Sequence, residues 1–157
     1  RLSLVGSEMC IRDRYSYGQI VESMRRLPVE SARHEPPRVA VSRSHKSPEL
    51  AEYIEELRKS HPDLEVVEQG SSYKFCLLAE GAVDYYFRTT STYEWDTAAG
   101  ELILSEAGGE TLSLPDYRPL RYNKTDLVNP WFFCRARKMP GCRPEAEMMV
   151  GECSAAD

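Results

Sequence analysis

The chain has 157 residues and a mass of 17.9 kDa, which is the size of one domain and leaves little room for two. Its 41% hydrophobic and 29% charged residues are typical of globular proteins and argue against wholesale disorder and against a fibrous repeat. The formal net charge of −5 repels nucleic acid, so we expect no DNA or RNA partner.

No apolar stretch approaches the ~20 residues that cross a bilayer, so no transmembrane segment is expected. Peripheral association with the inner membrane stays open. The five cysteines form an odd set without a CxxC pair, which argues against a disulfide framework and against a structural zinc site. We therefore expect a cytoplasmic protein.

The first 37 residues lack the pattern of a folded domain. Residues 1–14 (RLSLVGSEMCIRDR) carry neither a signal-type apolar run nor an amphipathic period, and they resemble sequencing-adapter read-through. We interpret them as non-native. Residues 15–37 contain one predicted short helix, Gly18–Arg26, followed by a proline-bearing stretch, and are interpreted as a linker or remnant.

From residue 38 onward, short β-branched stretches alternate with segments that carry apolar residues at helical spacing. Ser47 is a suitable N-cap and Pro48 a suitable first residue of a helix. Glycines follow two later helical segments at the positions where glycine commonly ends a helix. In chain order we predict a strand at Arg38–Ser42, a helix from Pro48 to the stop at His61-Pro62, a strand at Leu64–Glu68, a helix at Tyr73–Glu80, a strand at Val83–Arg88, a helix at Trp95–Ala107, and strands at Glu110–Leu114, Leu120–Tyr122 and Trp131–Cys134. This order predicts one α/β domain over residues 38–134, with a layered, mixed and largely parallel sheet and flanking helices. Residues 135–157 show no pattern and are predicted to be a disordered tail.

The run WDTAAG at residues 95–100 carries the most chemical information. An Asp at the start of a helix is usually a cap whose carboxylate accepts backbone N–H groups. Because small residues follow Asp96 at once, a metal ion or a phosphate could also approach this helix terminus closely. The residues alone leave both interpretations open.

The longer run WDTAAGELILSEAGG resembles the second signature of the inositol monophosphatase superfamily. With VSRSH at 41–45, GSSYKFCLLAEG at 70–81 and NPWFFC at 129–134, the chain is similar to the 3'(2'),5'-bisphosphate nucleotidases of the CysQ type over residues 38–134. A single WDxAAG does not distinguish between the branches of the superfamily, whereas Ser-Arg-Ser-His together with Gly-Ser-Ser-x-Lys-Phe-Cys points to the nucleotidases. The resemblance implies the C-terminal half of a sugar-phosphatase-type αβαβα fold.

The resemblance implies a Mg²⁺-dependent phosphatase of sulfur assimilation that removes the 3'-phosphate of adenosine 3',5'-bisphosphate, a small nucleotide bisphosphate. Asp96 matches the metal-ligating carboxylate that the C-terminal half contributes. The family's upstream Asp-Pro-x-Asp-Gly-Thr motif and upstream Glu have no counterpart here, so the chain is expected to be a truncated enzyme that is inactive alone. The alternatives are an inositol monophosphatase-like enzyme and an inert fragment with residual nucleotide binding.

Five further residues are candidates for binding the substrate. The resemblance places Ser44 and His45 in the loop that lines the nucleotide pocket, and Arg88 near the substrate phosphate. Ser71 and Lys74 sit at the turn into a helix, where N–H groups and an ammonium can hold a phosphate oxygen. The alternatives are a surface histidine, a lysine on a solvated helix face and an exposed arginine at the end of a strand.

Three other reactive side chains receive no role. Cys76 lies in an apolar helix run and is expected to pack as a small hydrophobic residue. Glu80 and Asp84 are expected to face solvent, since their spacing does not bring them together.

Overall fold

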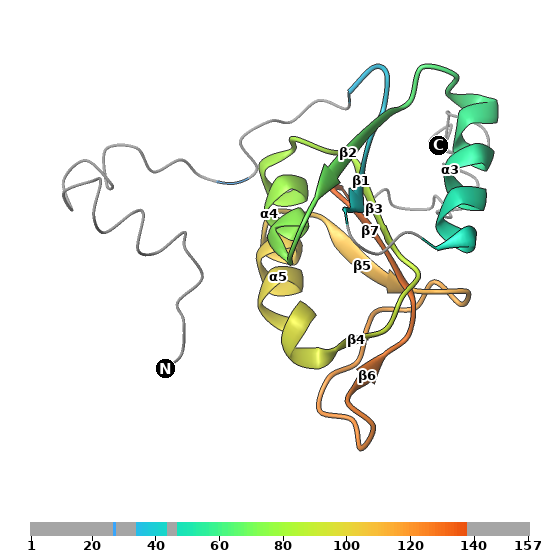
Figure 1. Cartoon of the computed structure of the whole chain (residues 1–157). Helices are drawn as coiled ribbons and strands as arrows, with labels where there is room; N and C mark the ends of the chain where they lie inside the picture. Colours follow the sequence, from blue (N-terminus) through green and yellow to red (C-terminus); the bar gives the residue numbers. More distant parts are fainter. Residues whose placement is uncertain (1–26, 28–33, 44–46, 138–157) are drawn as a thin grey trace, which may run out of the picture.

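The computed structural model describes residue 27, residues 34–43 and residues 47–137. Within this part of the chain, a five-stranded sheet has the order β2-β1-β3-β7-β5, and β4 and β6 form a separate pair (Figure 1). The strands of the larger sheet are β1 Arg38–Ser42, β2 Glu65–Gln69, β3 Tyr85–Arg88, β5 Glu110–Ser113 and β7 Phe132–Arg135. The pair consists of β4 Thr92–Tyr93 and β6 Val128–Asn129. The described helices are α3 Pro48–Ser60, α4 Tyr73–Glu80 and α5 Glu94–Glu106.

The larger sheet is mixed. β1 runs parallel to both β2 and β3, whereas β7 runs antiparallel to both of its neighbours, β3 and β5. Helix α3 connects β1 to β2, and α4 connects β2 to β3, which is the strand–helix alternation that parallel pairs need. The predicted α/β class with a mixed sheet and flanking helices is therefore confirmed.

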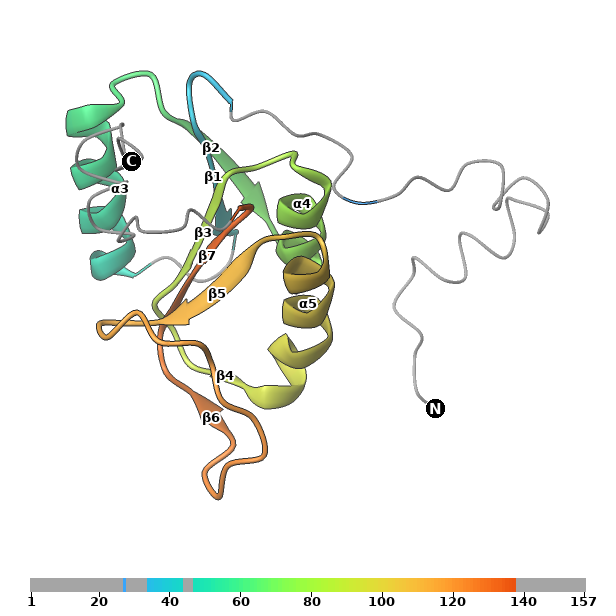
Figure 2. The ribbon, with the colours of Figure 1, turned by 180° about the vertical axis from the view of Figure 1, so that it is seen from behind.

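Helices cover both faces of this sheet, with α3 on one side and α4 and α5 on the other (Figures 1 and 2). Side chains alternate along each strand, so Val39 and Phe87 belong to the core beneath α3, while Ala40 and Tyr86 belong to the core beneath α4 and α5. Burial on both faces explains why the central strands β1, β3 and β7 carry consecutive buried apolar residues, whereas β2 at the edge of the sheet carries exposed polar ones.

The local signals that predicted the helices are found where they were expected. The Ser47 hydroxyl accepts the Leu50 N–H at 3.2 Å, and Pro48 is the first residue of α3. Helix α4 ends at Gly81, whose φ of 76° lies in the left-handed region that favours glycine. Gly108, with a φ of 91°, has the same role after α5.

One predicted strand is wrong and two short strands were not predicted. Leu120–Tyr122 forms no strand, and the only pairing nearby is an isolated bridge from Leu112 to Pro119. The apolar side chains of Leu120 and Tyr122 pack against the core beneath α4 and α5, so their pattern marked burial and not strand pairing. β4 and β6 have two residues each, which is too short for any periodicity.

The last strand continues one residue further than predicted. Arg135, which was assigned to the tail, belongs to β7, is 5% exposed and forms an ion pair with Glu110 on the neighbouring strand. The rest of the predicted tail from residue 138 onward, like residues 1–26, lies outside the described residues.

The close contact between α4 and α5 depends on Gly100. A Cβ atom at this position would lie 2.6 Å from Cδ2 of Phe75, whose ring is 1% exposed and is held between Tyr86 and Phe132. We expect Gly100→Ala to lower the free energy of unfolding by up to about 2 kcal/mol, because the ~1–3 kcal/mol cost of overpacking exceeds the ~1 kcal/mol that alanine normally adds to a helix. Chemical denaturation measures this difference, and an unchanged or higher stability would contradict the contact.

Candidate functional site

A cavity of about 290 Å³ lies where the carboxyl ends of β1 and β3 meet the first turns of α4 and α5. Ligand sites in open α/β sheets form at this edge, because the loops that leave the strands diverge there. The lining residues come from both strands, both helices and the β4 and β7 segments: Ser42, Ser71, Ser72, Lys74, Phe75, Tyr86, Arg88, Thr92, Asp96, Thr97 and Phe132.

The structure brings four of the six predicted site residues together in this cavity. Ser71 and Lys74 come from the start of α4, Arg88 from the end of β3, and Asp96 from the first turn of α5. The other two, Ser44 and His45, lie outside the described residues.

Lys74 is almost completely buried, with 1% of its surface exposed, so the alternative of a solvated helix face is wrong. Its Nζ donates to the carbonyl oxygens of Gln69 at 3.1 Å and Ser71 at 2.7 Å, and lies 4.9 Å from the centre of the Tyr86 ring. Desolvation, followed by the nearby charge of Arg88, lowers the pKa of Lys74 to about 8. An ammonium has three protons, and the two carbonyls use two of them.

Among the described residues, no carboxylate forms an ion pair with Lys74 or Arg88. Arg88 is half-buried, and its Nε atom is buried without a hydrogen-bond partner among the described residues. Buried cations and unpaired N–H donors are costly unless a ligand compensates them. The cavity is thus electrostatically suited to an anion, and a phosphate group has the oxygens that such donors need.

Asp96 is the third residue of α5 and is exposed at the edge of the cavity. One carboxylate oxygen, Oδ2, accepts the Tyr93 N–H at 2.9 Å, which is the capping contact expected of an acidic residue here. The other oxygen has no partner among the described residues. Asp96 can therefore cap the helix and still offer one oxygen to a ligand in the cavity.

The described residues do not form a metal site by themselves. Among them there is no group of three or more His, Cys, Asp or Glu side chains that could hold an ion, and Asp96 is the single acidic residue of the cavity lining. Hard divalent cations such as Mg²⁺ take about six oxygen ligands and usually need more than one carboxylate. Asp96 is the one carboxylate that the described part of the chain brings to the cavity.

The N-terminal turn of α4 adds hydroxyl groups to the cavity. Ser71 has a φ of 62°, and this turn directs the chain into the helix. Ser72, at the cap position, makes no side-chain cap hydrogen bond, so its hydroxyl is not used to close the helix end. The positive end of the helix dipole and these hydroxyls favour a negatively charged group.

Several residues of the lining, including Ser42, Tyr86 and Thr97, were not predicted from the sequence. Ser42 ends β1 and could have been found from the rule that ligand sites form at carboxyl ends of strands. Tyr86 is buried in the core, and its ring also lies against the buried Lys74 ammonium. Thr97 has the sequence context of an ordinary helix residue, and no signal in the sequence marks it as part of a site.

The expectation that Asp84 faces solvent is wrong. It is 8% exposed, accepts the Arg38 N–H at 2.8 Å and contacts the His34 ring nitrogen Nδ1 at 3.0 Å. Its carboxylate therefore ties the segment before β1 to the start of β3, away from the cavity. Cys76 is partly buried, and desolvation raises the pKa of its thiol, in agreement with a packing role.

Within the described ranges, no helix combines the length and the apolar character that a bilayer crossing requires.

Comparisons with known proteins show which family the chain resembles. The inositol monophosphatase family model matches residues 14–131. The nucleotidase CysQ of Salmonella typhimurium, named a 3'(2'),5'-bisphosphate nucleotidase, is 41% identical over 115 residues, which are 69% of this chain and 42% of the relative. A Rhizobium leguminosarum protein, described as an uncharacterized protein in the pss 5' region, is 56% identical over 69 residues, 40% of this chain and 72% of that protein.

A solved structure shows the same fold. The crystal structure of CysQ from Bacteroides thetaiotaomicron matches with a TM-score of 0.68 and 45% identity, over 80% of this chain and 46% of that protein. The chain spans less than half the length of these CysQ proteins. With the matched sequence, the mixed sheet and the cavity at its carboxyl edge taken together, the chain belongs to the inositol monophosphatase family.

Proposed function

We propose that this chain is the C-terminal half of a Mg²⁺-dependent 3'(2'),5'-bisphosphate nucleotidase that removes the 3'-phosphate of adenosine 3',5'-bisphosphate. The observation that carries the proposal is the cavity in which two cations without carboxylate partners among the described residues, Lys74 and Arg88, lie beside Asp96. The identity of 41–45% to CysQ proteins supports the nucleotidase branch over an inositol monophosphatase-like enzyme.

The residues of the cavity would act on the phosphate by binding and orienting it. Lys74 retains one proton for a phosphate oxygen, since Gln69 and Ser71 accept its other two. The unpaired Nε of Arg88 provides a further donor. Cations held in a partly desolvated cavity stabilise the charge of a phosphoryl group more strongly than cations in water.

Asp96 is the residue of this chain that would contact Mg²⁺, through its unused carboxylate oxygen. Bound Mg²⁺ would polarise the phosphate and activate water, which is what the ion supplies in such phosphatases. The remaining metal ligands would come from residues outside the described part of the chain.

An exposed apolar face on α5 supports the proposal that a second half of the protein packs here. Helix α5 packs on the sheet with its other face (Figure 1). Trp95, Leu102 and Ile103 are nevertheless 66%, 61% and 40% exposed. Several large apolar side chains exposed on one helix are typical of an interaction site. The CysQ relatives are more than twice as long as the region that this chain matches. We infer that the part of the full-length protein that corresponds to their additional residues packs on this face of α5.

The domain boundaries remain part of this proposal. The family match begins at residue 14, so residues 1–13 lie outside it, which supports the interpretation of those residues as non-native but places residue 14 within the family sequence. The match includes residues 15–37, so these residues would be family sequence that leads from the first half into the second. Residues 38–135 would form the C-terminal domain, since β7 extends to Arg135. Among the described residues, Cys76 and Cys134 are free thiols, which supports a reducing, cytoplasmic location.

Release of inorganic phosphate from adenosine 3',5'-bisphosphate by the full-length enzyme tests the function, with inositol monophosphate as the comparison substrate. Faster turnover of the inositol ester would favour the alternative enzyme.

Binding of adenosine 3',5'-bisphosphate to the chain is expected to weaken about tenfold between pH 7 and pH 9. The lowered pKa of about 8 means that Lys74 is charged below this pH and neutral above it, whereas the phosphates stay doubly charged above pH ~7. Loss of a charged hydrogen bond weakens binding by about one order of magnitude. Titration calorimetry measures the dissociation constant, and Lys74→Met is expected to bind weakly at both pH values. A constant affinity for the unaltered chain would contradict the role of Lys74.

A further inference from the structure

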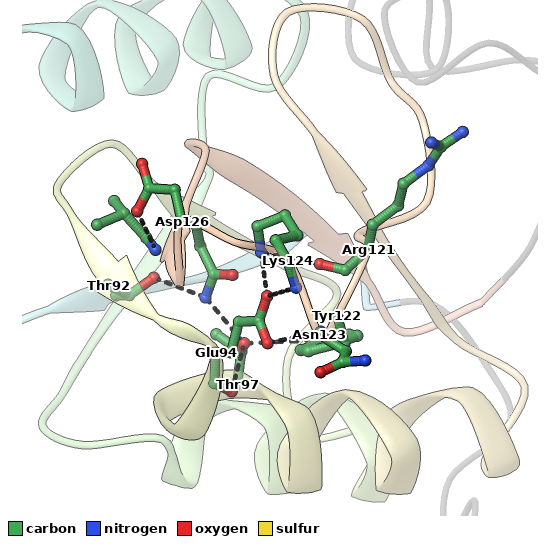
Figure 3. A network of polar contacts seen from close by, with 10 residues as sticks. Thr92, Glu94, Thr97, Arg121, Tyr122, Asn123, Lys124 and Asp126 are labelled. Carbon is green, nitrogen blue, oxygen red and sulfur yellow. Dashed lines mark hydrogen bonds and ion pairs between the residues drawn. The ribbon is translucent and has the colours of Figure 1, made fainter.

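Thr97 is the centre of a hydrogen-bond network at the first turn of α5 (Figure 3). It is 1% exposed. Its hydroxyl donates to the Glu94 carbonyl oxygen at 3.3 Å and accepts from the Tyr122 hydroxyl at 3.2 Å and from Asn129 Nδ2 at 3.0 Å. A hydroxyl offers one proton and two lone pairs, so the hydrogen-bonding capacity of this one is fully used.

Two of these partners, Tyr122 and Asn129, tie the helix to two other segments of the chain. Asn129 uses its second amide proton on the Thr92 hydroxyl at 3.3 Å, and these two residues also pair across β4 and β6. Tyr122 reaches the helix from the loop before β6 (Figure 3). Desolvation raises the pKa of Tyr122, which keeps its hydroxyl protonated as a donor.

Glu94 stabilises the same turn by binding the loop at Asn123 and Lys124. Its carboxylate accepts the N–H groups of Asn123 at 2.7 Å and Lys124 at 3.1 Å, and it forms an ion pair with the Lys124 ammonium. These hydrogen bonds, the one from the Lys124 side chain first, lower the pKa of Glu94. The first turn of α5 is thus held by a loop and by a strand, in addition to its own helix bonds.

This network adjoins the cavity. Thr92, Asp96 and Thr97 all line the cavity, and Asp96 is the residue before Thr97. Because the Thr97 hydroxyl is saturated, it has no bond left for a substrate. We propose that Thr97 is a positioning residue, which holds the first turn of α5 so that the Asp96 carboxylate keeps its place relative to Lys74 and Arg88. Its effect on catalysis rests on the phosphatase function proposed above.

Replacement of Thr97 by valine, which has the same shape without the hydroxyl, tests this role. In the 157-residue chain, we expect the Tyr93 amide, which is bonded to Asp96, to exchange its hydrogen about tenfold faster, since a buried hydrogen bond contributes about one order of magnitude. Thr97→Ser restores the hydroxyl and is expected to return exchange to within about twofold of the unaltered chain. NMR-detected hydrogen exchange measures both.

In the full-length enzyme, Thr97→Val is expected to lower kcat at least tenfold with little change in KM for the nucleotide, and Thr97→Ser to recover most of the loss. A lower melting temperature with unchanged kcat and unchanged Tyr93 exchange would overturn the proposal. Tyr122→Phe, which removes one bond of the network, is expected to act in the same direction if the valine variant does not fold. Absence of turnover in the unaltered enzyme would refute the phosphatase function instead, while Tyr93 exchange would still decide the role of Thr97.

Discussion

The isolated 157-residue chain is expected to release no phosphate from adenosine 3',5'-bisphosphate in the presence of Mg²⁺, whereas the chain joined to an N-terminal half with the family's carboxylate motif is expected to do so. Within the described residues, Asp96 is the single carboxylate of the cavity, and phosphoryl transfer of this type needs a metal pair held by several. Metal-assisted hydrolysis accounts for most of the rate of such enzymes, so the expected difference is many orders of magnitude.

The assay for this prediction measures inorganic phosphate released by the chain alone, by the N-terminal half alone and by the joined protein. The joined protein should also show a higher melting temperature, because the exposed face formed by Trp95, Leu102 and Ile103 would become buried. Metal-dependent turnover by the purified chain alone would disprove the idea that the catalytic ligands are divided between two halves.

Replacement of Asp96 by asparagine in the joined enzyme is expected to lower kcat by orders of magnitude. Asparagine keeps the size of the side chain, and its carbonyl oxygen can still accept the Tyr93 N–H, so the helix cap survives. It lacks the negative charge that a hard cation such as Mg²⁺ prefers in its ligands. The melting temperature in metal-free buffer should therefore stay close to that of the unaltered protein while activity is lost.

The Mg²⁺ dependence of the rate distinguishes the two interpretations of Asp96. If Asp96 is a metal ligand, the asparagine variant needs a much higher Mg²⁺ concentration or fails to saturate. If it is a cap and no more, the two curves overlie each other, and Asp96 would have to be removed from the site. Asp96→Ala is the matched control for the capping contact, with an expected loss of about 0.5–1.5 kcal/mol in the free energy of unfolding for the lost hydrogen bond to the Tyr93 N–H.

Much of the fold was predictable because its signals are local. A helix such as α3 is specified by a cap, a proline and a spacing within one short segment, so Ser47, Pro48 and His61 were sufficient to locate it. The end of α4 follows from Gly81 in the same way, since only the conformation of one residue is involved. The motif around Asp96 was likewise recognisable from contiguous residues.

Burial and pairing were decided by segments far apart in the chain. Lys74 was ambiguous in the sequence because its desolvation comes from contacts made by the fold, including the Tyr86 ring on another element. Asp84 was misjudged for the same reason, since its partner Arg38 lies 46 residues away.

The sequence by itself determined the alternation of strands and helices, the capped ends of α3 and α4 and the family motif, because each depends on residues within a few positions of one another. The tertiary structure alone decided that Ser71, Lys74, Arg88 and Asp96 share one cavity and that Thr97 holds the turn that carries Asp96. The physical reason is that hydrogen bonds and electrostatic interactions act through distances in space, and these distances exist only after the strands have paired and the helices have packed.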